Sequence, residues 1–401
     1  MHAYRAPRAF DGERCIPGEA LVLVSGSTIL AVEPGTAAAP ADCPVTEVPG
    51  GTLLPGLIDA HVHLCGDGGP RALDQLPELG NDELDEIVAT SLAIQLASGV
   101  TAVRDLGDAR WTVVDRHRAH PEGPTVVGSG PPITCPDGHC AGMGGEASGE
   151  DGLRRAVRER AEHGVDVIKV MTSGGMLTEG TDVTQCQFTL TELRALVDEA
   201  HRAGLPVTGH AHAVTAVEMC LAAGLDGIEH CSCMTAQGIA MPESLAEALA
   251  ASGVAVCPTL NHAPDVQPPP RVQALLDHLG LSPEVHRAHV GALHRVGVRL
   301  IGGTDSGIGP AQPHGSMRQS VIDMVDAGIP CSQALAAATG QAARASGLSG
   351  RTGRLAPGLD ADLLLVDGDP LTDITALRDV RLVLSRGWEA VAAGASGDDR
   401  P

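Results

Sequence analysis

Two histidines, His61 and His63, stand one residue apart directly after the apolar run Leu53–Asp59. On an extended backbone, residues i and i+2 point to the same side, so both imidazoles can bind one metal ion. The pair alone is a weak signal, because two histidines on the protein surface would show the same spacing.

Lys169 lies within another apolar run, Asp166–Met171, and it is the only lysine among 27 basic residues. Pairing with a nearby carboxylate would explain such a lysine, since burying a lone charge is costly. The alternative is a neutral amine that adds carbon dioxide and becomes a carbamate, whose two oxygens can bridge two cations. Arginine stays protonated and cannot supply this amine. The single lysine therefore stands where carbamate chemistry would forbid its replacement by arginine.

Three further polar residues come at the ends of apolar runs: His210, His230 and Asp305. Imidazole and carboxylate groups together suit borderline and hard divalent metals, and Zn²⁺ is the first expectation. Packing would readily explain one histidine at a strand end. The whole set, distributed over five strand-like runs, favours a metal site.

The elements that must position these side chains alternate along the chain. Eight strand-like runs alternate with helix-like segments, which predicts an α/β fold, a (β/α)8 TIM barrel, with all strand carboxyl ends at one rim. A doubly wound sheet is the competing fold, but it would require a GxGxxG loop after the first strand, which Leu64–Gly69 does not match. The expected strands are Leu53–Asp59, Thr101–Leu106, Thr125–Gly128, Asp166–Met171, Val207–His210, Gly227–Glu229, Val254–Cys257 and Arg299–Gly303. The expected helices are Asp82–Ala97, Gly152–His163, Thr191–Ala203, Val214–Ala223, Pro242–Ala251, Pro283–Val296 and His314–Ala327.

Both ends of the chain contain short β-branched runs, such as Ala20–Val24 and Asp362–Val366. Such runs, separated by turn residues, are typical of antiparallel strands. We therefore expect residues 1–54 and 351–391 to form one small β-sandwich, residues 55–350 to form the barrel, and residues 392–401 to be a flexible tail.

Composition restricts the class of protein. The net charge of -23 disfavours nucleic acid and anionic membranes as partners and favours a small-molecule substrate. The chain has no apolar run of membrane-spanning length and no apolar signal-peptide core at its start. Its 11 cysteines, an odd number, indicate reduced thiols. We expect a cytoplasmic protein that forms a homo-oligomer.

Five segments together resemble the metal-binding motifs of the amidohydrolase superfamily: Pro55–His63, Ile168–Met171, Gly209–His212, Ile228–His230 and Gly303–Asp305. The most similar branch is the imidazolonepropionase-like group, which includes prolidases, lysine/arginine carboxypeptidases and ochratoxinase-type amidases. The resemblance covers nearly the whole chain and is specific as a set, although no motif is specific alone.

This resemblance implies two divalent metal ions, with Zn²⁺ expected. His61, His63 and Asp305 would hold the more buried ion, and His210 and His230 the more exposed one. Carboxylated Lys169 would bridge the two ions. A shared water would ionise near neutral pH, and Asp305 would accept its proton and pass it to the leaving nitrogen. Imidazolonepropionase itself is a one-metal enzyme without this lysine, so that activity is disfavoured.

Two other histidines, His139 and His212, are candidates for the hydrogen-bond donor that stabilises the tetrahedral oxyanion. His212 lies two residues beyond His210, and His139 lies in the glycine-rich loop 136–149. A supporting role outside the reaction centre is an equal alternative for each. Related prolidases use a tyrosine near the site, but the only tyrosine here is Tyr4.

Arg104 and His262 are the candidates for substrate binding. Arg104 ends the second expected strand and could bind a substrate carboxylate, although a structural network with Asp105 is the simpler alternative. His262 belongs to the long segment 261–282, which is long enough for a lid, and the segment 176–187 could also cover the site.

The sequence thus predicts a binuclear metal-dependent hydrolase of a small amide, such as a dipeptide or an N-acyl amino acid. A cyclase, dehydratase or lactonase on the same scaffold is the alternative. A non-catalytic metal-binding protein is disfavoured, because a scaffold has no need of Asp305 beside an open metal site.

Overall fold

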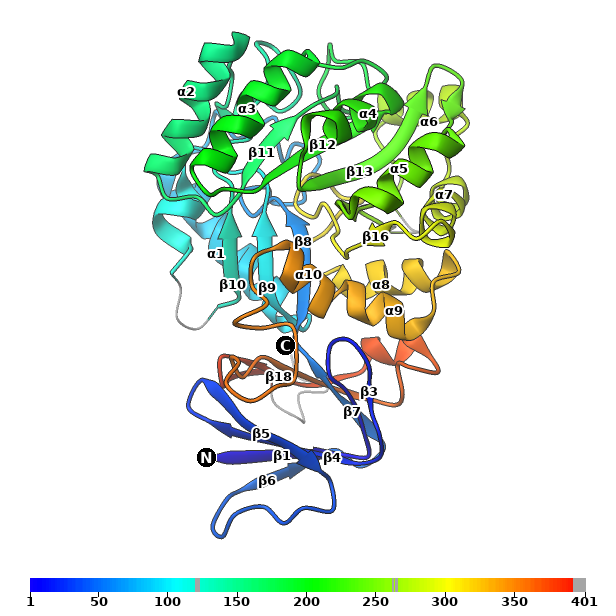
Figure 1. The fold of residues 1–401 in the computed structure, drawn as a ribbon. Helices are drawn as coiled ribbons and strands as arrows, with labels where there is room; N and C mark the ends of the chain where they lie inside the picture. Colours follow the sequence, from blue (N-terminus) through cyan, green and yellow to red (C-terminus); the bar gives the residue numbers. More distant parts are fainter. Residues whose placement is uncertain (120–122, 262, 264–265, 392–401) are drawn as a thin grey trace.

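The computed structural model describes residues 1–119, 123–261, 263 and 266–391. Figure 1 shows two parts: a larger one in which helices surround parallel strands, and a smaller one of mainly antiparallel strands that contains both ends of the described chain. The larger part carries the candidate ligands, and the smaller part lies below it in this view.

Parallel strands form the centre of the larger part. One sheet has the order β10-β9-β8 and the other the order β11-β12-β13-β15-β16. Backbone hydrogen bonds join the two sheets at both edges, from Ile133 N to Lys169 O (2.8 Å) and from Ala60 N to Gly302 O (3.0 Å). The strands are β8 (Leu57–Val62), β9 (Val100–Asp105), β10 (Thr125–Gly128), β11 (Ile168–Met171), β12 (Val207–Ala213), β13 (Gly227–Thr235), β15 (Ala255–Cys257) and β16 (Arg299–Leu300), and β14 (Gly238–Ile239) pairs antiparallel with β13.

The first expected strand, Leu53–Asp59, is in fact two. The structure divides it into β7 (Gly51–Pro55), which belongs to the smaller part, and β8. Pro55 has no N–H group to continue a ladder, and a side chain at Gly56 would collide with Thr101. The chain therefore changes sheets at this point.

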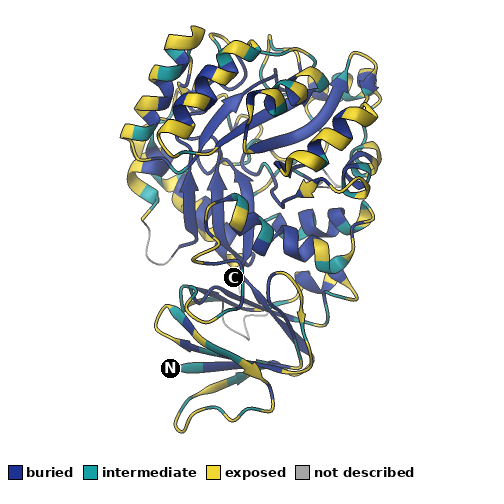
Figure 2. Ribbon diagram, viewed as in Figure 1, coloured by how far each residue is buried: buried dark blue, intermediate teal, exposed yellow. Residues whose placement is uncertain are grey.

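Helices pack on the outside of the parallel strands, with one face buried and the other exposed (Figure 2). All seven expected helices are present, with ends shifted by a few residues, and α6, α9 and α10 were not expected. The helix α6 lies within the segment predicted to be a lid loop; it begins at Pro270, a residue favoured in the first helical turn, and ends at Gly280 in the left-handed conformation. The helices are α1 (Asn81–Ala97), α2 (Gly149–Glu162), α3 (Leu190–Arg202), α4 (Val214–Ala223), α5 (Glu243–Ser252), α6 (Pro270–Leu279), α7 (Pro283–Arg295), α8 (Met317–Asp326), α9 (Cys331–Ala337) and α10 (Gly340–Ala345), with short turns η1 (Val113–His117), η2 (Ala141–Met143) and η3 (Ile374–Arg378).

The smaller part contains two sheets, one formed by the N-terminal end alone and one by strands from both chain ends. The four-stranded sheet has the order β5-β4-β1-β6 and the six-stranded sheet the order β19-β18-β17-β7-β2-β3. Val22 and Ile29 of the first sheet share a buried apolar cluster with Leu53, Leu365 and Leu382 of the second. The strands are β1 (His2–Ala6), β2 (Arg8–Phe10), β3 (Cys15–Ile16), β4 (Ala20–Ser25), β5 (Thr28–Pro34), β6 (Val45–Glu47), β17 (Leu363–Asp367), β18 (Val380–Ser385) and β19 (Trp388–Val391).

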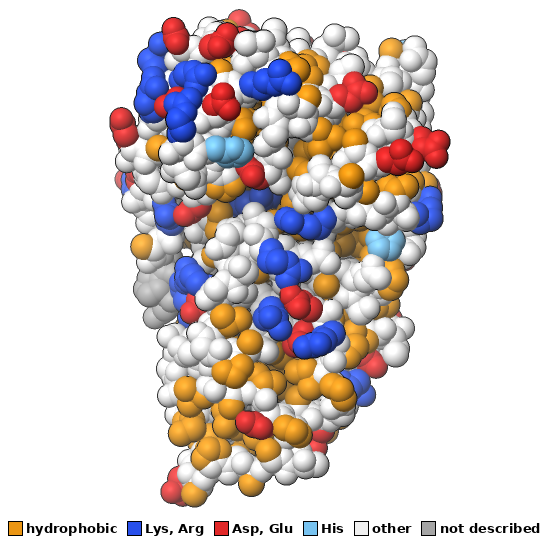
Figure 3. Space-filling view, in the orientation of Figure 1, with side chains coloured by type: hydrophobic (Ala, Val, Ile, Leu, Met, Phe, Trp, Pro, Cys, Tyr) orange, Lys and Arg blue, Asp and Glu red, His pale blue; other side chains and the backbone are white. Residues whose placement is uncertain are grey.

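Charged side chains of both signs lie on the face shown in Figure 3, with basic groups gathered over α2 and α3. There Glu199 forms ion pairs with Arg154, Arg158 and Arg202. Among the helices of the described residues, none has the length and apolar character needed to cross a membrane.

Candidate metal centre

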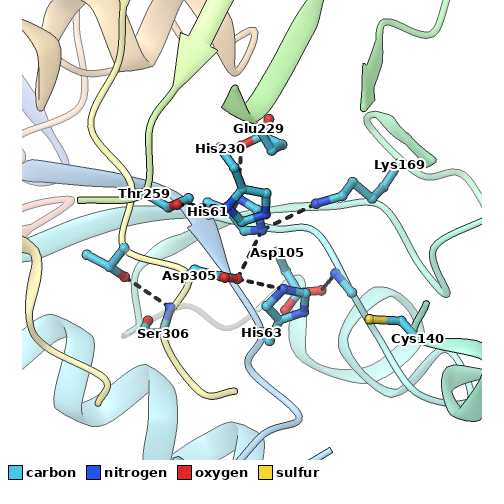
Figure 4. A network of polar contacts seen from close by, with 12 residues as sticks. His61, His63, Asp105, Cys140, Lys169, Glu229, His230, Thr259, Asp305 and Ser306 are labelled. Carbon is cyan, nitrogen blue, oxygen red and sulfur yellow. Dashed lines mark hydrogen bonds and ion pairs between the residues drawn. The ribbon is translucent and has the colours of Figure 1, made fainter. Parts of the chain in front are cut away.

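His61 on β8, His63 directly after it and Asp305 after β16 converge at one place (Figure 4). Asp305 Oδ1 lies 3.3 Å from His61 Nε2 and 3.1 Å from His63 Nε2. Ligand atoms about 2.0–2.2 Å from a tetrahedral zinc ion lie roughly 3.3–3.6 Å from one another. The three side chains therefore have nearly the spacing that one metal ion requires.

Lys169 on β11 points to the same place. Its Nζ lies 3.3 Å from His61 Nε2, and the side chain is buried. Burial lowers the pKa of Lys169, although Glu229 and Asp305 act in the opposite direction. In the part of the chain that the structure describes, no carboxylate oxygen lies within 4.0 Å of Nζ. The structure thus gives the carboxylate-paired lysine no support and leaves an amine among the candidate ligands.

His210 of β12 and His230 of β13 form a second group of candidate ligands, together with His212. Their ligand nitrogens lie within 4.8 Å of one another. Burial lowers the pKa of His210 and of His230 well below its usual range, and it lowers the pKa of His212 to about 4. Neutral imidazoles are the form that binds metal ions.

Hydrogen bonds decide which ring nitrogen of His210 and His230 carries a lone pair. The carbonyl of Gly174 can only accept, so His210 donates to it through Nε2 at 3.1 Å and keeps its lone pair on Nδ1. Thr259 donates its hydroxyl hydrogen to Pro258 O, so it accepts from Nδ1 of His230 at 2.8 Å. Each histidine therefore has one nitrogen held by a partner and the other available to a metal ion.

The carboxylate of Glu229 on β13 faces Nδ1 of His61 as a charged neighbour. Its Oε2 lies 2.9 Å from His61 Nδ1, and its Oε1 lies 2.8 Å from Nη2 of Arg104. Burial raises the pKa of Glu229, but Arg104 and His61 outweigh this and hold it well below its ordinary value. An ionised carboxylate beside Nδ1 favours a hydrogen on that atom and a lone pair on Nε2.

The structure gives the prediction that Arg104 binds substrate no support. The side chain is 3% exposed, and it donates to Ala60 O at 2.7 Å and to Glu229. The simpler alternative, a structural role, holds, but the partner is Glu229 rather than Asp105. Asp105 instead accepts a hydrogen bond from Leu64 N at 2.8 Å. The sequence did not predict either of these two contacts, because local spacing does not show which residues of separate strands and loops come together.

Buried Asp59, which sequence analysis also missed, attaches β8 to the segment that carries Asp305. It accepts hydrogen bonds from Thr304 N at 3.0 Å and from Thr304 Oγ1 at 2.6 Å. Asp305 has a φ of 58°, in the left-handed region that non-glycine residues rarely adopt, and His230 has a φ of 65°. Such strain is concentrated at functional sites, where the surrounding contacts hold it in place.

The remaining candidates lie around these two groups. His139 is buried, and its ring centroid lies 4.6 Å from that of His210. His212 Nδ1 lies 2.9 Å from Ser232 Oγ. Thr178, in the segment 176–187 that was expected to cover the site, contacts His139 Nδ1 at 2.8 Å. His262 lies outside the described residues.

The donor set fits divalent metal ions on two independent grounds. The side-chain atoms of His61, His63 and Asp305 have ligand spacing, and no hydrogen from the described residues is donated to His210 Nδ1 or His230 Nε2. His63 Nδ1 is buried and has no hydrogen-bond partner among the described residues.

Comparisons with known proteins agree with this geometry. A model of the amidohydrolase family matches residues 52–388. The chain is 28% identical over 374 residues to ochratoxinase of Aspergillus niger, covering 82% of this chain and 73% of that protein. It is 27% identical over 394 residues to imidazolonepropionase of Deinococcus radiodurans, covering 90% and 89%. A crystal structure of a Xaa-Pro dipeptidase with bound methionine has the same fold, with a TM-score of 0.84 and 24% identity over 97% and 99% of the two chains.

Proposed function

Since this chain belongs to the amidohydrolase family and is a hydrolase acting on C–N bonds, we propose that it uses a binuclear metal centre to cleave a small amide, such as a dipeptide or an N-acyl amino acid. The observation that carries the proposal is the convergence of both candidate ligand groups, whose His61 and His230 rings lie 5.3 Å apart, with Lys169 3.3 Å from His61. Ochratoxinase and the Xaa-Pro dipeptidase support the choice of amides as substrates.

In this proposal, His61, His63 and Asp305 would hold one ion, His210 and His230 would hold the other, and carboxylated Lys169 would supply a ligand to both. Two bound divalent cations, Zn²⁺ in our expectation, would lower the pKa of a shared water and polarise the substrate carbonyl. Asp305 takes the proton of the attacking water and transfers it to the leaving nitrogen.

His139 and His212 are the proposed donors to the oxyanion. Both rings lie within 4.6 Å of the His210 ring, so they border the second ligand group. A donor that is already oriented stabilises the developing charge without reorganisation at the moment of reaction. Arg104 has no place in this scheme except through Glu229 and His61.

We propose further that the two parallel sheets form one closed (β/α)8 barrel and that residues 1–54 and 351–391 form a β-sandwich against it. Hydrogen bonds between the sheets at both edges support closure. In a closed barrel the strand carboxyl ends meet at one rim, which explains why ligands from five strands converge.

Two measurements test the proposal. Protein purified after growth with zinc should contain two metal ions per chain, and ¹³C-bicarbonate should give one carbamate signal. A panel of Xaa-Pro dipeptides and N-benzoyl amino acids should then show release of an amino acid by the metal-loaded protein. Less than one metal per chain would contradict the metal centre. A fully loaded protein that releases no amino acid would instead favour a lactonase, cyclase or dehydratase.

A further inference from the structure

Thr178 contacts one ring nitrogen of His139, whose ring centroid lies 4.6 Å from that of the candidate ligand His210. Its hydroxyl oxygen lies 2.8 Å from His139 Nδ1 and accepts a hydrogen bond from Cys140 N at 3.2 Å. The backbone N–H of His139 donates to Gln187 Oε1 at 2.6 Å. A Cβ at Gly175 would lie 2.2 Å from the His139 ring, so this ring packs directly on glycine backbone. The segment 173–187 therefore holds His139 from several sides.

The hydrogen-bonding capacity of Thr178 indicates where His139 carries its hydrogen. A hydroxyl has one hydrogen and two lone pairs, and Cys140 N–H uses one lone pair. If the hydroxyl donates to Nδ1, its hydrogen is paired and the imidazole hydrogen lies on Nε2. If Nδ1–H donates instead, the hydroxyl hydrogen has no acceptor among the described residues. In either arrangement Nε2 can pair with Cys140 Sγ at 3.5 Å, so the first leaves only the weakly polar thiol hydrogen unpaired, whereas the second leaves the hydroxyl hydrogen unpaired. The first arrangement is therefore favoured.

This arrangement gives His139 an N–H donor at the position where the candidate ligands have a lone pair. His210 and His230 each have a lone pair available for a metal ion, because their other nitrogens donate to Gly174 O and Thr259, and Nδ1 of His61 faces the Glu229 carboxylate. His139 would present an N–H group beside them, with only the weak acceptor Cys140 Sγ at 3.5 Å from Nε2.

We propose that Thr178 is a positioning residue that holds His139 in the Nε2–H form, so that His139 donates a hydrogen bond to the substrate carbonyl oxygen and does not act as a base. The catalytic consequence rests on the proposed function, whereas the position of the hydrogen does not.

The helix α6 places the segment that carries Thr178. Nη2 of Arg271 on α6 donates to Met176 O at 3.0 Å and to Leu177 O at 2.8 Å, directly before Thr178. Beneath these contacts, Leu279 of α6 packs with Val183 of the same segment in a small apolar cluster. A disturbance at Arg271 should therefore reach His139 through Thr178.

Nuclear magnetic resonance of ¹⁵N-histidine-labelled protein tests the proposal directly. The His139 signal is identified by its absence from His139→Asn. In the wild-type protein and in Thr178→Ser, the hydrogen should lie on Nε2, and in Thr178→Val the two forms should mix. Thr184→Val is the matched control, because Thr184 lies in the same segment and its hydroxyl contacts Asp182 rather than His139. A wild-type hydrogen on Nδ1, or an unchanged signal in a folded Thr178→Val, would overturn the proposal.

Kinetics on the best amide of the panel give the second readout. Thr178→Val should lower kcat about 10–100-fold with little change in KM, as expected when a partner of an active-site histidine is removed. Thr178→Ser should restore most of the activity, Thr184→Val should match the wild type, and Arg271→Gln should lie between. Equal losses in Thr178→Val and Thr178→Ser would contradict the role of the hydroxyl. If no amide is hydrolysed, the proposed function fails, and the ¹⁵N result alone decides the role of Thr178.

Discussion

The rim of the parallel strands and the two sheets formed by the chain ends bury different kinds of groups. At the rim, His61 and Lys169 are 1% exposed and Glu229 is fully buried, and each has a polar neighbour. In the two sheets of the smaller part, called the end sheets below, the shared core is almost entirely aliphatic. Burying polar and titratable groups is costly, and clusters of such groups are typical of functional sites. The rim is therefore the region of this fold where we expect the chemistry to take place.

The largest effect should come from Lys169→Arg. Arginine cannot form the bridging carbamate, so the protein should bind at most one metal ion per chain. Its activity should fall more than about 100-fold, which exceeds the loss expected when a residue that only hydrogen-bonds to a metal ligand is replaced. Metal analysis and hydrolysis of the amide panel measure both. Arg158→Lys, on the surface of α2, is the control. A fully active Lys169→Arg protein would refute the carbamate bridge.

Glu229→Gln compares a buried ion pair of the rim with an exposed one of the end sheets. It leaves Arg104 buried without an opposite charge, which should cost about 3–5 kcal/mol of unfolding free energy, and it should weaken metal binding about 10–100-fold. Glu47→Gln breaks the exposed Arg5–Glu47 pair and should cost less than about 1 kcal/mol. Denaturant unfolding measures the loss of stability of both variants, and metal titration measures their loss of metal affinity. Equal losses in the two variants would contradict the expected difference between the rim and the end sheets.

Leu365→Ala should separate stability from function. This fully buried side chain belongs to the aliphatic core of the end sheets, so its truncation should cost about 2–5 kcal/mol. Metal content and kcat of the folded protein should stay unchanged, because no candidate ligand contacts this cluster. Loss of metal from folded Leu365→Ala would show that the two regions are coupled.

The smallest effect concerns Asp362, a carboxyl group buried beside the end sheets. Burial raises the pKa of Asp362 from 3.8 to about 6, and Asp360 adds to this effect. Between pH 4 and 6 the unfolded chain releases a proton that the folded one retains, so the stabilising contribution present at low pH is lost as the pH rises. Asp362→Asn keeps an acceptor for Arg386 N and should be more stable than the wild type by roughly 2–3 kcal/mol at pH 7 and equal at pH 3. Thermal unfolding of both proteins from pH 3 to pH 7 measures this difference. A stability difference that does not change with pH would contradict a contribution from the titration of Asp362.

Much of the fold followed from local sequence patterns. Hydrophobic periodicity and glycine caps predicted seven of the ten α-helices of the described residues, because those signals depend on neighbouring residues. The same patterns failed at Leu53–Asp59, where Pro55 and Gly56 divide one apolar run between two sheets. They also failed at α6, because the segment 261–282 predicts a lid loop, whereas Pro270 begins a helix within it.

By itself, the sequence determined which groups are available: paired histidines, one lysine and an aspartate at the ends of apolar runs, in a chain otherwise rich in arginine. Only the tertiary structure decided their partners. Arg104 pairs with Glu229, 125 residues away, and His139 pairs with Thr178, 39 residues away. Such contacts depend on strand order and loop packing rather than on local spacing. For that reason the ligand types could be predicted from the sequence, whereas the position of each imidazole hydrogen could not.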